Sequence, residues 1–123
     1  MNKTRAVRLA IQEKLASICT DTYFSQADAD ASLPYLVYII NEISCEYGLT
    51  LCELEVNAVD YGKDTSVCDA LADTVQTELD QWLYIDDDVE FTVYRDRRQI
   101  VTEEDRNIIR RRMTFEVRMH ERG

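Results

Sequence analysis

The chain has 123 residues, and its 46% apolar content with seven tyrosines, three phenylalanines and one tryptophan is typical of one globular domain with its own core. Its 24 acidic residues against 14 basic ones give a net charge of −10, concentrated in residues 21–96, which carry −16. Residues 1–20 and 97–123 each carry +3. A protein that grips nucleic acid through its phosphates needs clustered lysines and arginines, so the acidic middle argues against that function.

Four cysteines and a single histidine, His120, offer no recognisable metal-binding pattern, because no Cys-x-x-Cys pair occurs. We expect free thiols in a reducing cytoplasm, with a disulfide between Cys45 and Cys52 across a hairpin as the alternative. No apolar run approaches the ~18 residues of a membrane span, and none follows Met1–Arg5, so we expect neither a signal peptide nor contact with a membrane.

Residues 4–19 are predicted to form a helix, because apolar side chains recur there at spacings of four, four and three: Val7, Ile11, Leu15 and Ile18. Residues 20–33 form a polar connection that contains a short aromatic segment, Tyr23-Phe24. Asp28 and Asp30 resemble the start of a calcium loop, but the glycine and glutamate that such a loop needs are missing.

Two strands are predicted next. Pro34 opens the first, which runs from Tyr35 to Cys45 and is rich in β-branched and aromatic residues. After a turn at Glu46-Tyr47-Gly48, residues 50–61 alternate cleanly between apolar and polar side chains, which is typical of a half-exposed antiparallel partner.

A second helix follows Asp64 or Thr65, with apolar residues at every fourth position from Val67 to Leu79 and Trp82 alongside, and it ends at Ile85–Asp88. A second hairpin is then predicted, with strands over residues 89–94 and 113–119 separated by a long charged loop, Arg95 to Arg112. Loops of this length are usually functional or mobile.

These elements predict one α+β domain over residues 1–123. Its antiparallel or mixed β-sheet has about four strands, with two helices packed on one face, in the order α-β-β-α-β-β. The second face of such a sheet is either partly solvated or in contact with another subunit.

No pattern in the chain predicts catalysis, a cofactor or a metal, so we expect a protein that is not an enzyme. The three glycines are isolated, and Glu53 and Glu55 lie two apart on a strand, as a solvated strand face would place them. Three consecutive carboxylates, Asp86, Asp87 and Asp88, diverge in direction and are expected to form a polar turn.

Six arginines flank the long charged segment. They either solubilise the chain or meet the acidic middle of a neighbouring copy, since basic ends and an acidic centre favour head-to-tail contacts. The predicted subunit-interface residues are Arg95, Arg97, Arg98, Arg110, Arg111 and Arg112.

Several segments in this order resemble the tail-terminator, or tail-completion, proteins of long-tailed bacteriophages, which include the tail-to-head joining proteins of siphophages. They are the strand Leu33-Pro34-Tyr35-Leu36-Val37-Tyr38, the second strand Leu54–Asp60, the helix segment Ala70-Leu71-Ala72-Asp73, and the final strand Arg111–Arg118. The chain departs from many relatives in its four cysteines and in the lack of glycine and proline between Tyr23 and Leu33.

This resemblance implies a structural virion protein, assembled in the host cytoplasm, that forms a ring, commonly a hexamer. The ring caps the tail tube, terminates its polymerisation and joins it to the head–neck connector. DNA passes through such a ring without specific binding, and a negative bore would repel its phosphates. We therefore expect an acidic lumen, with these residues lining or approaching it: Glu53, Glu55, Asp86, Asp87 and Asp88.

Two alternatives stay open from the sequence. One is a head-side neck or adaptor protein, which differs in its partner. The other is an acidic DNA mimic that inhibits a nucleic-acid-binding enzyme, for which the acidic middle segment would be the contact surface.

Overall fold

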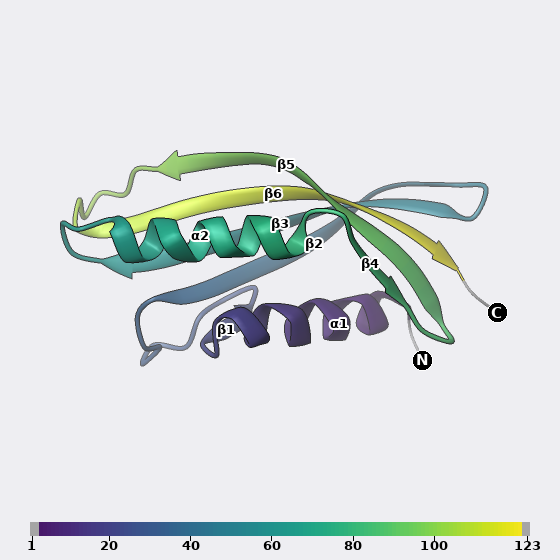
Figure 1. Ribbon diagram of the computed structural model, residues 1–123, viewed down its shortest axis with the longest axis horizontal. Coiled ribbons are helices and arrows are strands. Elements are labelled where there is room, and N and C mark those ends of the chain that lie inside the picture. The colour runs from purple at the N-terminus through teal and green to yellow at the C-terminus, as the bar shows by residue number, and fades with distance from the viewer. Residues whose placement is uncertain (1–2, 122–123) are drawn as a thin grey trace.

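The structure is a computed structural model that describes residues 3–121. It consists of one sheet of six strands with two helices on one of its faces (Figure 1). In chain order the elements are α1 (Lys3–Ile18), β1 (Thr22–Phe24), β2 (Tyr35–Glu46), β3 (Leu49–Tyr61), α2 (Ser66–Leu79), β4 (Trp82–Ile85), β5 (Val89–Val101) and β6 (Ile108–Glu121). The predicted domain boundaries at residues 1 and 123 lie outside the described residues.

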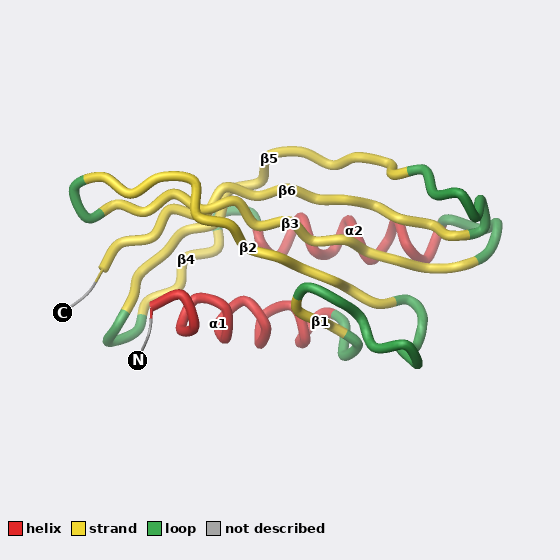
Figure 2. Tube along the Cα trace, turned by 180° about the vertical axis from the view of Figure 1, so that it is seen from behind, coloured by secondary structure: helices red, strands yellow, loops and turns green. Residues whose placement is uncertain are grey.

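The strands are arranged in the order β1-β2-β3-β6-β5-β4. The short β1 runs parallel to β2, and every other neighbouring pair is antiparallel. The sheet twists strongly and curves like part of a barrel. In Figure 1 α2 lies in front of the sheet, whereas in the view from behind the strands lie in front of α2 (Figure 2).

The predicted four-stranded sheet in the order α-β-β-α-β-β is wrong, because the sheet has six strands and the element order is α-β-β-β-α-β-β-β. The segment Tyr23-Phe24 belongs to β1, which pairs with only three residues of β2. Trp82 does not lie on a helix but opens β4. Both additional strands are short edge strands whose pairing comes from tertiary contacts and leaves little periodicity in the sequence.

The predicted long loop is also corrected. The strands β5 and β6 extend toward each other as far as Val101 and Ile108, so the connection shrinks to residues 102–107. All six arginines of the predicted interface therefore lie in strands.

The core lies between the two helices and one face of the sheet. Helix α1 contributes Val7, Ile11 and Leu15, which are buried as its apolar spacing predicts. The helices cover every second residue of the central strands, among them Leu54, Val56, Ala58, Met113, Phe115 and Val117. The opposite face of the sheet carries no helix formed by residues 3–121 and is called the helix-free face below.

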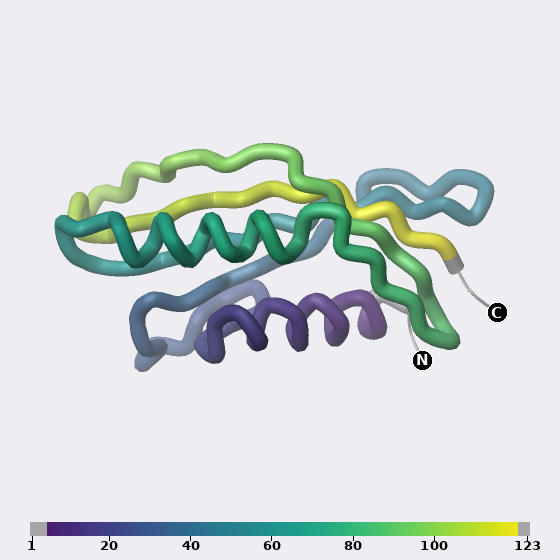
Figure 3. The backbone as a smooth tube through the Cα atoms, in the orientation of Figure 1, coloured from purple at the N-terminus to yellow at the C-terminus, as the bar shows by residue number. Residues whose placement is uncertain are grey.

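The β2–β3 hairpin projects beyond the ends of both helices (Figure 3). Its two-residue turn places Tyr47 and Gly48 at φ values of 51° and 81°, the left-handed pair that a type I′ turn requires. Residues 41–48 are all exposed, and the Tyr47 side chain is 99% exposed at the tip. This hairpin therefore extends two strands of the sheet past the core.

Candidate functional site

Glu53 and Glu55 both point to the helix-free face, as their alternation with buried Cys52 and Leu54 predicts. The Glu55 carboxylate accepts a hydrogen bond from Asn57 Nδ2 at 3.0 Å and lies 3.5 Å from Arg112 Nε. Glu53 pairs in register with Asn41 of β2 and with Glu116 of β6. Of the two predicted lumen residues on β3, only Glu55 therefore has a cation beside it in the described ion pairs.

A shallow hollow on the helix-free face brings three carboxylates together, those of Glu53, Asp96 and Glu116. Ile43 and Leu51 contribute apolar side chains to its rim. Glu116 is partly neutralised by Arg118, whose Nε donates to it at 2.9 Å. Asp96 and Glu116 are not among the site residues predicted from the sequence, although the alternation of Phe115, Glu116 and Val117 indicates that Glu116 faces away from the core.

The three aspartates 86–88 form the turn between β4 and β5, at a different place from Glu53. Glu53 lies level with Glu116 and, through it, with Tyr94 of β5. From Tyr94 to Asp88 the strand runs six residues, which is roughly 20 Å at the rise of a β-strand. The structure therefore does not gather the five predicted lumen acids into one cluster.

Asp86 organises that turn. Its Oδ1 accepts hydrogen bonds from the backbone N–H groups of Asp88 and Val89, each at 2.8 Å, and its Oδ2 accepts one from the Tyr84 hydroxyl at 2.8 Å. This last bond, together with burial, raises the pKa of Tyr84 above its ordinary value of 10.0. Residues Asp86–Asp88 thus form a polar turn, as predicted. Asp86 accepts the hydrogen bonds of the turn, and Asp87 and Asp88 expose their side chains.

We expect Asp86→Ala to lower the free energy of unfolding by about 1–2 kcal/mol, because three hydrogen bonds lose their acceptor. The matched variant Asp87→Ala changes an exposed neighbour in the same turn and is expected to stay within about 0.5 kcal/mol of the wild type. Urea denaturation of both variants measures the difference. Equal stabilities would contradict the role given to Asp86.

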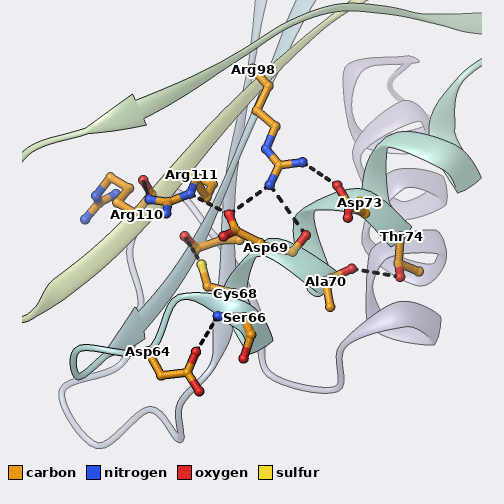
Figure 4. A network of polar contacts seen from close by, with 11 residues as sticks. Asp64, Ser66, Cys68, Asp69, Ala70, Asp73, Thr74, Arg98, Arg110 and Arg111 are labelled. Atoms are coloured by element: carbon orange, nitrogen blue, oxygen red, sulfur yellow. Dashed lines mark hydrogen bonds and ion pairs between the residues drawn. The ribbon is translucent and has the colours of Figure 1, made fainter.

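Four of the six predicted interface arginines form ion pairs with carboxylates that are not their sequence neighbours. Arg111 is buried, and its Nε donates to Asp69 Oδ1 of α2 at 2.7 Å. Arg98 reaches the same carboxylate oxygen at 3.0 Å and also pairs with Asp73 (Figure 4). The other two pairs are Arg110 with Glu103 at 2.7 Å and Arg112 with Glu55 at 3.5 Å.

The pairing around Asp69 joins α2 to the two strands β5 and β6. The hydrogen bond from Arg111 is the main reason why the pKa of Asp69 lies below its ordinary value of 3.8, and hydrogen bonds from Thr65 and Arg98 act in the same direction. The ion pairs of Arg111 and Arg98 with Asp69 therefore stabilise the packing of α2 against β5 and β6.

Arg95 and Arg97 remain exposed on β5. Among the described ion pairs, Arg97 has only its sequence neighbour Asp96 as a counter-ion, at 3.7 Å, with both side chains about half exposed. Such a pair contributes little to the stability of the fold. These two arginines are the members of the predicted set whose charge is most accessible to another molecule.

Near each of the two edges of the sheet, one strand has a stretch without a neighbouring strand among the described residues. β1 covers β2 only at Leu36–Tyr38, which leaves residues 39–46, here called the β2 open edge. β4 covers β5 only at Glu90–Val93, and Asp80 accepts the N–H of Arg95, which leaves residues 97–101, here called the β5 open edge. Unpaired edges of this length are sites where another strand can add.

Among residues 3–121, no group of three or more His, Cys, Asp or Glu side chains is arranged to hold a metal ion. The four cysteines are free, and Cys45 lies opposite Thr50 rather than Cys52. Over the same residues no helix is long and apolar enough to cross a membrane.

The comparisons with known proteins point to one fold. Neither a protein-family model nor a curated protein matches the chain. Among solved structures, it is similar to a chain of the "Virion of native gene transfer agent (GTA) particle", with a TM-score of 0.68 and 15% sequence identity over 86% of this chain and 84% of that chain. At this identity the similarity establishes a shared fold.

Proposed function

We propose that this chain is a structural virion protein that forms a ring on the tail tube, terminates tube polymerisation and provides the joint to the head–neck connector. The observation that carries the proposal is the fold shared with a chain of a gene transfer agent virion over 86% of the sequence. The resemblance of the first strand, the second helix and the last strand to tail-terminator proteins narrows the virion role to this position.

The surface of the protein supports a role in assembly. It presents two open sheet edges, two accessible arginines on β5, and a hairpin tip with an almost fully exposed tyrosine. Exposed strand edges and aromatic side chains are features that partners cover. We treat residues 1–123 as the single domain that carries this function.

The oligomeric state tests the proposal most directly. We expect the purified chain to form rings, hexamers in the first instance, and to bind the open ends of preformed tail tubes in electron micrographs. Light scattering after size-exclusion chromatography gives the mass. Rings that bind only head connectors would favour the head-side neck protein, and a monomer that stays isolated even beside tubes would overturn the proposal.

We further propose that the helix-free face lines the bore, which gives Glu53 and Glu55 the lumen role. Both helices would then lie outside. The turn of Asp86–Asp88 lies elsewhere, so we assign its exposed members, Asp87 and Asp88, only to the approach of the lumen, and Asp86 to the turn itself.

Charge reversal of the two glutamates, Glu53→Lys with Glu55→Lys, is expected to slow DNA passage, because lysines in the bore attract phosphates. Ring mass should stay unchanged, since neither residue belongs to an open edge. DNA ejection from assembled particles provides the measurement, with Glu53→Gln and Glu55→Gln as a control that removes charge without adding attraction. Ejection as fast as that of the wild type would contradict the lumen assignment.

A further inference from the structure

We propose that neighbouring copies join by strand addition, with the β5 open edge of one copy pairing antiparallel to the β2 open edge of the next. This inference rests on the proposed ring and specifies how its subunits meet. It starts from the observation that each copy has an unpaired stretch of strand near each of the two opposite edges of its sheet. A head-to-tail contact requires this arrangement.

The charges of the two edges are complementary. The β2 open edge carries Glu42 and Glu46 and no basic residue. The β5 open edge carries Arg97 and Arg98, and Arg95 precedes it. Because Arg98 is engaged by Asp69 and Asp73, Arg97 is the edge cation available to a neighbour. A β2 open edge would repel a second β2 open edge, so the charges favour pairing of the β2 open edge with the β5 open edge.

Opposite charges on one face indicate the register. Glu46 is in register with Leu49 and Arg97 with Thr114, so both side chains project from the helix-free face. Placing Glu46 opposite Arg97 in an antiparallel pair also places Ser44 opposite Gln99. Ser44 and Gln99 both project from the helix-free face, so the joined sheet keeps its two faces.

The flanking strands leave room for this pairing. In the same register Val93, where β4 stops covering β5, lies level with Thr50, beyond the turn of the β2–β3 hairpin. Tyr38, where β1 stops covering β2, lies level with Asp105 in the β5–β6 loop. Neither short edge strand therefore obstructs the neighbour.

The register also has the stagger of a closed barrel. Within one copy Ser44 lies level with Thr92, through Leu51 and Arg118. Because the register of β5 and β6 shifts between Arg95 and Arg97, pairing with Gln99 of the next copy displaces the strands by about six positions, from Arg118 to Arg112 on β6. This is roughly 20 Å across four strands that span about 19 Å. It corresponds to a strand tilt of about 46°, close to the ~35–45° typical of barrels. The ring would thus be lined by a continuous sheet.

Paired cysteines test this contact. In a background with Cys45→Ser, a chain carrying both Ser44→Cys and Gln99→Cys is expected to form a disulfide-linked ladder up to the full ring on mild oxidation. Directly opposed cysteines on neighbouring strands have the short Cβ separation that a disulfide needs. Each single variant alone should give no ladder, and a mixture of the two single variants should give linked dimers only.

Two further pairs, Ser44→Cys with Arg97→Cys and Ser44→Cys with Val101→Cys, cover a register shift of two residues in either direction. If rings form with the wild-type mass but none of the three pairs gives a ladder, the strand pairing is overturned and the proposed ring stands. In that case the register irregularities that the structure shows between Glu42 and Ser44 of β2 and between Arg95 and Arg97 of β5 serve to protect the edges instead. If the wild type forms no ring on any tube, the proposed function fails as well.

Discussion

The Asp69→Ala variant is expected to lose about 2–4 kcal/mol of unfolding free energy, because Arg111 stays buried after its carboxylate partner is removed. The Arg111 side chain is only 9% exposed, so its charge would stay largely shielded from water without Asp69. The expected loss is smaller than that for a fully buried pair, since the Asp69 side chain is 36% exposed and partly screened by solvent. Urea denaturation at neutral pH measures it.

Asp73→Ala is the matched control on the same helix. Among residues 3–121 the ion-pair partner of Asp73 is Arg98, and the Asp73 side chain is 70% exposed, so we expect a loss below about 1 kcal/mol. Equal losses of unfolding free energy for the two variants would contradict the larger stabilisation expected from the contacts of Asp69.

The pH dependence of the unfolding free energy distinguishes the effect of the Asp69 charge from the effect of the size of its side chain. The pKa of Asp69 is lowered by folding, so its contribution is fully present above its ordinary pKa of 3.8 and is lost as the pH falls through the lower value of the folded state. The stability difference between the wild type and Asp69→Asn should therefore be largest near neutral pH and vanish in acid. A difference that persists unchanged in acid would contradict an electrostatic origin.

Periodicity predicted the elements whose stability depends on one buried face. Val7, Ile11 and Leu15 place α1 on the sheet, and Val75 and Leu79 do the same for α2. The alternation of Cys52, Leu54 and Val56 orients β3 correctly. In these elements the local pattern and the tertiary packing agree, so the sequence alone carries the information.

The strands that were not predicted from the sequence lack such a pattern. β1 is three residues long and β4 is four, which is too short for a period to be recognised. The extension of β5 from Arg95 to Val101 carries mostly exposed, charged side chains, and pairing with β6 is what orders it. Charge patterns predict a loop in such a segment, although backbone pairing decides the structure.

Which residues come together in the candidate site also depends on how the strands pair. The sequence indicates that Glu53 and Glu55 share a face, but only the register shows that Glu116 lies beside Glu53. Likewise, six arginines look equivalent in the sequence, whereas the fold buries Arg111 and leaves Arg97 exposed. Long-range partners decide which charges are used inside the chain and which remain for a neighbour.

That distinction makes Arg97 the residue whose reversal should affect the ring most. We expect Arg97→Glu to raise the concentration at which rings dissociate by roughly tenfold to hundredfold, since it places a second carboxylate opposite Glu46 of the neighbour. Light scattering over a dilution series at low and high salt measures the change, which should shrink as salt screens the repulsion. The folded subunit should keep its stability, because the ion pair of Arg97 in the described part of the chain is with exposed Asp96.

A reciprocal exchange decides whether Glu46 is the partner. Glu46→Arg alone should weaken the ring as Arg97→Glu does, but a chain that carries both changes restores an opposite-charge pair at every contact and should assemble again. Lys63→Glu changes the net charge by the same amount as Arg97→Glu in the turn before α2, outside both edges, and should leave assembly intact. If the doubly changed chain assembles no better than either single variant, Glu46 and Arg97 do not meet, and the neighbour must engage another part of the sheet edge.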